Sequence, residues 1–231
     1  MNKQCVMNNV YRIVLIGLLI FGCRSNTSKK EITATKIEFN QNLTDELKRM
    51  ETVDQIAAYI PQGEYAKLSE KEWNSFKDSV FTTHQKRIEE IFDEFGFVGY
   101  DLAGKEGSDN FWVIVQHADH NPEFQKKVLD KMKVQVDKKN ATPEYYGYLV
   151  DRVHINTGKE QVYGTQFDYN EFGQAFPKNI SDTTGINARR ISLGLTPMIE
   201  RMNEMTLFHF EMNKAYFVQK GITEPRLYSI D

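Results

Sequence analysis

The chain has 231 residues, of which 29 are basic and 32 acidic, so its formal net charge at pH 7 is -3. A mildly acidic protein lacks the concentrated basic face that nucleic-acid binding requires, and we expect no nucleic-acid partner. The chain has only two cysteines, too few for a disulfide framework, so a hydrophobic core must stabilise it. The length is sufficient for one ordinary domain.

The first 23 residues have the pattern of a cleaved export signal. Lys3 and Arg12 precede a short apolar run, residues 13–22, and Cys23 follows it. The run is too short for a membrane-spanning helix, which needs roughly 20 residues, but it suits a signal peptide. Because a cysteine stands at the cleavage position, the segment resembles a bacterial lipoprotein signal, and we predict a signal peptide over 1–22 and lipidation of Cys23. Plain secretion, or retention of the uncleaved segment, is the alternative.

Cleavage before Cys23 would change both the charge and the cysteine content. It removes Lys3 and Arg12, which leaves 27 basic and 32 acidic residues and a net charge of -5. It also removes Cys5, so the sulfur of the one remaining cysteine carries lipid. We therefore predict a lipid-anchored protein of the bacterial cell envelope. Well-studied Gram-negative lipoproteins kept in the inner membrane carry aspartate where this chain has Arg24, a resemblance that favours the outer membrane, facing the periplasm.

A polar tether and a helical domain follow the predicted anchor. Residues 23–40 lack periodicity, which predicts a flexible tether, and residues 41–231 are predicted to form a single domain. Ser69 and Glu72 have the spacing of a capping box, which predicts a long helix that ends near Gly96. Before it, apolar residues at helical spacing predict a first helix with one buried stripe. The stripe is Leu43, Leu47, Met50, Val53, Ile56, Ala57 and Ile60.

Further helices are predicted by a repeated pattern, a capping residue followed by proline. The pattern occurs at Asn121–Pro122, Thr142–Pro143 and Thr196–Pro197. A shorter helix is predicted over Ile186–Leu193, where Gly194 would end it. These elements predict a domain of about six helices.

One segment departs from the helical pattern. Between His154 and Phe167, turn-forming residues at 156–159 are flanked by strand formers, which predicts a β-hairpin or an extended loop. The tail from Thr206 to Asp231 is aromatic but irregular. We therefore predict a mainly α fold: a single globular domain with a short β-hairpin.

His117 and His120 are the first candidate site residues. Histidines three residues apart suit two metal ligands on one helix face. However, the residue before the proline at 122 should be non-helical, so the helix is expected to end near Ala118 and His120 need not share the face of His117. A third ligand would have to come from elsewhere, with Asp151 or His154 nearest in sequence. Two ligands alone are weak evidence for a metal, and we predict none. The competing interpretation is a hydrogen-bonded core His117, with the turn 119–121 capping the next helix.

Asp151 and Arg152 form the second candidate. The arginine has the bidentate fork that binds a carboxylate or phosphate. The alternative is structural, in which the pair ties the helix end to the hairpin. Structural ties are the more common role of such pairs.

The third candidate is the segment that follows. If it is extended, Gln161, Tyr163 and Thr165 point to one face and Gln166 to the other. Together they predict either a hydrogen-bonding wall for a polar ligand or a buried polar network. Arg189 and its neighbour at 190 are the fourth candidate. Because adjacent helical residues diverge by about 100°, only one of the two can face inward.

In combination, these motifs resemble one bacterial family, domain-of-unknown-function family 6624. The resemblance covers roughly Ser69 to Arg201 and implies a real domain with this motif order, but it implies no activity. The matching pieces are Gln116-His117-Ala118-Asp119, Pro122 with Phe124-Gln125, Leu149 with Asp151-Arg152-Val153, Gly158 with Gln161, Tyr163-Gly164-Thr165-Gln166, and Arg189-Arg190 with Leu193-Gly194-Leu195-Thr196-Pro197.

Two classes of function remain open. In the first, the domain is a binding or interaction module with a polar pocket for a small anionic or sugar-like ligand, or a site for an envelope protein. In the second, it is a hydrolase that uses His117 as general base, oriented by Asp119 or Asp151, while Arg152 or Arg189 stabilises negative charge. No cofactor motif is present. Because the sequence shows no convincing nucleophile, we favour binding. The predicted ligand-binding residues are Arg152, Gln161, Tyr163, Thr165, Gln166 and Arg189.

Overall fold

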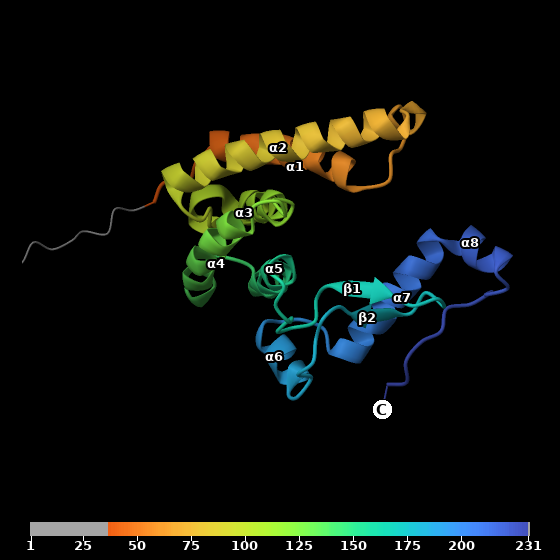
Figure 1. Cartoon of the computed structure of the whole chain (residues 1–231). Coiled ribbons are helices and arrows are strands. Elements are labelled where there is room, and N and C mark those ends of the chain that lie inside the picture. The colour runs from red at the N-terminus through yellow and green to blue at the C-terminus, as the bar shows by residue number, and fades with distance from the viewer. Residues whose placement is uncertain (1–36, 231) are drawn as a thin grey trace, which may run out of the picture. The chain divides into compact units, whose positions relative to one another are not determined.

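The computed structural model describes residues 37–230. The predicted signal peptide, Cys23 and most of the predicted tether lie outside these residues. Within them the chain is mainly helical, with one two-stranded antiparallel sheet, as predicted (Figure 1). The elements are α1 (Gln41–Ala58), the 3-10 turn η1 (Tyr65–Lys67), α2 (Glu70–Phe95), α3 (Tyr100–Gln116), α4 (Pro122–Asp137), α5 (Pro143–Asn156), β1 (Phe167–Tyr169), β2 (Ala175–Pro177), α6 (Ile186–Ser192), α7 (Met198–Met212) and α8 (Lys214–Gln219).

Two predicted helix starts are confirmed by capping contacts, whereas Thr142 makes no side-chain capping bond before α5 and Pro197 itself is the N-cap of α7. Ser69 and Glu72 form the reciprocal capping box that begins α2. The side chain of Asn121 accepts a hydrogen bond from the N–H of Phe124 and caps α4. Within the turn 119–121, Asn121 is therefore the capping residue. Proline stands in the first turn of both α4 and α5, where its missing N–H costs nothing.

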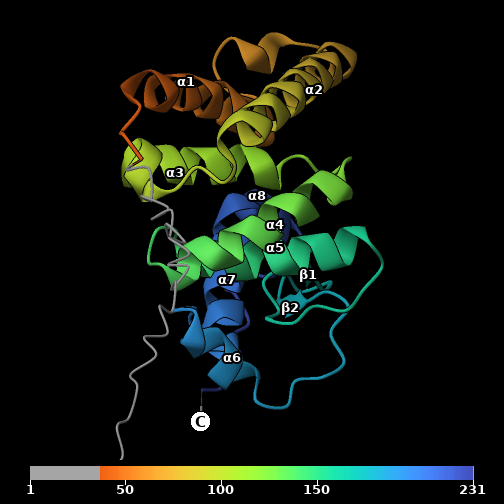
Figure 2. The same ribbon diagram turned by 90° about the vertical axis from the view of Figure 1, so that its left-hand side faces the viewer.

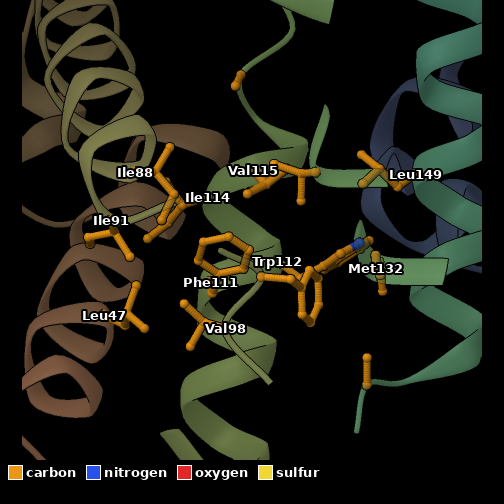
Figure 3. Close-up of a cluster of buried hydrophobic side chains, with 14 of the residues drawn as sticks. Leu47, Ile88, Ile91, Val98, Phe111, Trp112, Ile114, Val115, Met132 and Leu149 are labelled. Carbon is orange, nitrogen blue, oxygen red and sulfur yellow. The ribbon is translucent and has the colours of Figure 1, made fainter. Parts of the chain in front are cut away.

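The main hydrophobic core surrounds α3. α1 and α2 lie on one side of α3, while α4 and α5 lie on the other (Figures 1 and 2). The side chain of Phe111 lies toward Leu47 and Ile91, whereas Trp112 lies toward Met132 (Figure 3). α3 presents apolar side chains to both neighbouring layers and is therefore held firmly. This packing fixes the position of the residues at its C-terminal end.

The structure corrects the predicted stripe of α1. Val53 and Ile60 are exposed, while Asp54 is fully buried at the inward position between Met50 and Ala57. The inward face therefore follows Leu43, Leu47, Met50, Asp54 and Ala57. An acid occupies a core position in the middle of an apolar face.

The β-hairpin lies further along the chain than the predicted position between His154 and Phe167. α5 continues to Asn156, and the segment up to Gln166 forms a loop, the second of the two predicted alternatives. The strands are β1 and β2, paired from Phe167 with Pro177 to Tyr169 with Ala175. The predicted boundary at His154 was wrong because the helical spacing of α5 continues for two more residues.

The C-terminal helices pack against this hairpin. The hydroxyl of Thr206 on α7 accepts the N–H of Ala175 at 2.9 Å, and the Tyr228 hydroxyl donates to the carbonyl of Ala175 at 3.0 Å. The tail was predicted to be irregular, but α7 continues to Met212 and α8 follows it. No helix within residues 37–230 is both long and apolar enough to span a bilayer.

Candidate functional site

A buried carboxylate holds two histidines from different helices. Asp54 of α1 has no exposed side-chain surface, and its Oδ1 and Oδ2 contact Nδ1 of His117 and Nδ1 of His84, the latter at 3.5 Å. Burial alone raises the pKa of Asp54, but the hydrogen bonds from His117 and His84 outweigh it and hold this pKa below its ordinary value. Asp54 is therefore ionised at neutral pH.

The ionised state of Asp54 decides the tautomer of His117. An ionised carboxylate only accepts hydrogen bonds, so Nδ1 of His117 must carry the proton. Whenever this ring is neutral, its Nε2 then has an unshared electron pair. Within the described residues no hydrogen-bond partner is found for this Nε2. His117 therefore presents a fixed, proton-accepting edge.

The end of α3 brings His117 to a surface cleft. His117 is the C-cap residue of α3, and its ring packs edge-on against Phe81 of α2, with ring centroids 5.7 Å apart. The turn before α4 carries Asp119 and His120 to the same cleft. Both histidines of the predicted pair thus line one cavity, although the helix ends before it reaches His120.

Arg152 of α5 reaches this cleft through Asp119. Its Nε and one terminal nitrogen each donate to a different oxygen of Asp119 at 2.7 Å, a bidentate ion pair. Burial by itself raises the pKa of Asp119, but Arg152, together with Asn156 and Gln125, lowers it below its usual value. Arg152 is therefore paired with Asp119 and not with its neighbour in sequence, Asp151.

The resulting cleft has a mixed polar lining and a volume of about 700 Å³. It carries imidazole, guanidinium, ammonium, carboxylate and hydroxyl groups together with one aromatic ring, and they come from α1, α2, α5 and the turn between α3 and α4. Pockets of this size suit small molecules. The lining residues are Ala58, Lys77, Asp78, Phe81, Thr82, His117, Asp119, His120 and Arg152.

A larger cavity, about 930 Å³, lies at the C-terminal end of α1. Its lining is mainly apolar, with Tyr59, Ile60 and Leu68, and among the lining residues that the structure describes Glu64 is the one charged side chain. Size alone does not make a reactive site. The smaller cleft is the chemical candidate because it holds histidines, an arginine and a lysine.

Asp151 forms a second polar cluster that is closed. Its side chain is fully buried, and it accepts the backbone N–H groups of Val162, Tyr163 and Thr165 at 2.7, 3.0 and 2.8 Å. These three bonds fold the loop after α5 onto the helix. Asp151 therefore stabilises the loop and does not contact His117.

The other predicted ligand-binding residues mostly belong to this closed cluster. Gln161 is buried and bonds the backbone of Gln166 and Lys178. Thr165 is also buried, and Tyr163 is half-buried, which raises the pKa of its phenol. Of these residues, Gln166 also lines a cavity, a smaller one that it shares with Arg152. A ligand-binding role for Gln161, Tyr163 and Thr165 stays a prediction.

Both arginines of the fourth candidate bind carbonyl groups. Arg189 donates to the carbonyls of Val162, Asp182 and Thr184. Arg190 is 1% exposed and donates to those of Tyr163, Gly164 and Thr196. Its burial lowers the pKa of the Arg190 guanidinium. Arg190 is therefore the inward residue of the pair, while Arg189 is half-buried nearer the surface.

The two histidines that were weak metal candidates do not converge with a third ligand among the described residues. In the part of the chain that the structure describes, no group of three or more His, Cys, Asp or Glu side chains is placed to hold an ion. His120 is exposed on the turn, and His154 is bonded to the carbonyl of Glu160.

The structure adds Asp54, His84 and Phe81 to the candidate residues. Sequence reasoning found His117 but assigned it Asp119 or Asp151 as the orienting carboxylate, whereas the contact is with Asp54. One signal was present: Asp54 stands four residues after Met50 and three before Ala57, the spacing of an inward position. On α2, Lys77, Phe81 and His84 likewise share one helix face.

Comparison with known proteins identifies the type of domain. A family model described as a family of unknown function, DUF6624, matches residues 42–208. The matched region begins before Ser69 and ends after Arg201, so it is longer than the region of the expected resemblance. No curated protein and no solved structure matches the chain.

Proposed function

The chain belongs to DUF6624, a family of unknown function, and we propose that its domain binds a small polar ligand, anionic or sugar-like, in the cleft at the end of α3. The observation that carries this proposal is that His117 and Arg152 line one cleft while separate carboxylates fix both side chains. Because Asp54 and Asp119 hold these groups in advance, a ligand need not order them, and preorganisation of this kind favours affinity.

The lining of the cleft supports this class of ligand. Lys77 and Arg152 offer donors, Asp78 offers acceptors, and Nε2 of a neutral His117 accepts. A ligand with several hydroxyl groups satisfies such a mixture, and the ring of Phe81 offers an apolar face to a sugar ring. A purely apolar ligand would leave these polar groups desolvated without partners.

Histidine-resolved NMR titration tests this binding. The probes are N-acetylglucosamine and inorganic phosphate at millimolar concentration, and we expect at least one to shift the His117 ring signals saturably. Lys77→Ala should weaken that binding, whereas Lys86→Ala should not, because Lys86 is exposed on the same helix and does not line the cleft. If neither probe shifts His117, or if both lysine variants bind equally, the proposal fails.

We also propose that this domain is held at the bacterial cell envelope by lipid on Cys23, in the outer membrane and facing the periplasm. The support is the sequence pattern of residues 1–23 alone. Two or three acyl chains anchor a protein stably, since each buried methylene contributes about 0.8 kcal/mol. Cys23→Ser should abolish labelling with a palmitate analogue and release the protein from membranes, whereas Cys5→Ser should change neither. Membrane retention of Cys23→Ser contradicts the anchor.

The His117–Asp54 contact favours a second candidate, a hydrolase. Nε2 of His117 would take a proton from water, and the water oxygen would attack the carbonyl carbon of an ester. The bond to the leaving group would then break with its electron pair, and the leaving group would regain the proton from the imidazolium. Asp54 is the positioning residue in this scheme because it fixes the tautomer, and Arg152 would stabilise the oxyanion.

Turnover separates the two candidates. If the protein is a hydrolase, wild type should release nitrophenol from p-nitrophenyl esters above the buffer rate, and His117→Ala should abolish this release. Asp54→Asn should lower kcat with little change in KM, because it removes orientation and not ligand contact. Ligand binding that is lost in His117→Ala, without any wild-type turnover, leaves the binding module as the function.

A further inference from the structure

A second, smaller cavity adjoins the cleft. Its volume is about 200 Å³, and it shares two lining residues, Asp119 and Arg152, with the cleft. The Asp119–Arg152 ion pair is therefore a wall that is common to both cavities. The other lining residues are Ile155, Asn156, Gln166, Phe167 and Lys178.

The smaller cavity is rich in hydrogen-bond donors. A guanidinium has five N–H groups, and Asp119 uses only two of those of Arg152. Lys178 has three N–H groups, and its one ion pair, with Asp168 at 3.0 Å, is between exposed side chains. Such exposed pairs contribute about 0–1 kcal/mol, so the ammonium group can turn to another acceptor at little cost. Gln166 adds an amide to the same wall.

The one carboxylate in the lining of this cavity is already satisfied. Asp119 accepts hydrogen bonds from Arg152, from Asn156 at 2.8 Å and from Gln125 at 3.3 Å. Its charge is therefore balanced from the protein side. The donors that remain on Arg152 and Lys178 are suited to a group with several acceptor oxygens, and a carboxylate or a phosphate is such a group.

We propose that the two cavities form one binding site and that its ligand is bipartite: a sugar-like body in the cleft beside His117, and an anionic group in the smaller cavity between Arg152 and Lys178. This inference rests on the proposed function, and it narrows the ligand class to sugar derivatives that carry a carboxylate or a phosphate. Arg152 is then the residue that contacts both parts of the ligand.

Three sugars with the same ring test the proposal. N-acetylglucosamine is neutral, N-acetylmuramic acid is the same sugar with a lactyl carboxylate on O3, and N-acetylglucosamine 6-phosphate is the same sugar with a phosphate on O6. We expect at least one acidic sugar to bind wild type about tenfold more tightly than the neutral sugar in NMR titration, the gain typical of a charge-assisted contact. The two acidic probes distinguish a carboxylate from a phosphate.

Lys178→Ala should remove this gain and leave the affinity for the neutral sugar unchanged. The matched control is Lys159→Ala, because Lys159 is an exposed lysine of the loop after α5 and lines neither cavity. Equal affinities for neutral and acidic sugars, or an acidic gain that survives Lys178→Ala, overturn the bipartite site while the proposed function stands. Binding of phosphate at Lys178 without any sugar response at His117 also overturns it. If no probe shifts His117 at all, both proposals fail.

Discussion

Two fully buried carboxylates, Asp54 and Asp151, have opposite surroundings. Asp54 is bonded by two histidine side chains, one of which lines an open cleft. Asp151 is bonded by three backbone N–H groups of a single loop. A carboxylate that orders side chains leaves their far edges available to a ligand. A carboxylate that orders backbone leaves nothing exposed, so burial alone does not distinguish a site from a scaffold.

The largest expected effect is that of Asp151→Ala. The substitution leaves three N–H groups, one buried and two half-buried, without their acceptor, and since each unsatisfied donor costs up to about 1–3 kcal/mol we expect a total of about 3–5 kcal/mol. The free energy of unfolding, measured by urea denaturation, should fall by that amount. Asp130→Ala is the control, because Asp130 is an exposed acid of α4 and should change stability by no more than about 0.5 kcal/mol. A similarly small loss for Asp151→Ala would remove the difference between the two clusters.

Asp54→Asn should have a smaller effect on stability and a larger one on the cleft. The amide keeps the shape of the side chain and one acceptor oxygen, so we expect a loss of about 1–3 kcal/mol. The amide nitrogen only donates, so the histidine that faces it must either lose this partner or accept through a deprotonated Nδ1. The nitrogen chemical shifts of the His117 ring should then report a change of tautomer. Unchanged shifts would contradict the role assigned to Asp54.

The acid dependence of stability follows from the lowered pKa of Asp54. The unfolded chain binds a proton to this group at a higher pH than the folded chain does, so its stabilising contribution is complete above the ordinary pKa of 3.8. The contribution is lost as the pH falls through the lower, folded-state pKa. In acid titrations of unfolding, the stability difference between wild type and Asp54→Asn should therefore shrink as the pH falls below about 4. A difference that grows in acid would mean that the folded-state pKa is raised.

The sequence predicted the scaffold better than the site, for physical reasons that particular residues illustrate. Ser69, Asn121 and the prolines of α4 and α5 act on their own neighbours, so local spacing is enough to locate those helices. His117 was found for a similar reason, as part of a local motif. Its partner Asp54 is 63 positions away, and such a contact depends on how α1 packs on α3.

The polar residues of the loop after α5, predicted to form either a wall for a ligand or a buried polar network, show what local alternation leaves open. Gln161, Tyr163 and Thr165 were grouped as one wall because an extended strand would align them. The loop instead wraps around Asp151, and its polar groups turn inward to that carboxylate and to neighbouring carbonyls. Alternation predicts a shared face only where the backbone is a strand, and no local signal in these residues shows where the hairpin begins.

The smallest stability effect and the largest expected binding effect should coincide at Arg152. Its partner Asp119 is 45% exposed at the side chain, and partly exposed pairs contribute about 1 kcal/mol or less. A double-mutant cycle with Arg152→Ala and Asp119→Ala should give a coupling energy of that size in urea unfolding. The same Arg152→Ala variant should lose binding of both neutral and acidic sugars, because the side chain borders both cavities. A residue held ready for a ligand is one that the fold can lose at little cost. A stability loss as large as that of Asp151→Ala, with binding intact, would therefore mean that Arg152 has a structural role.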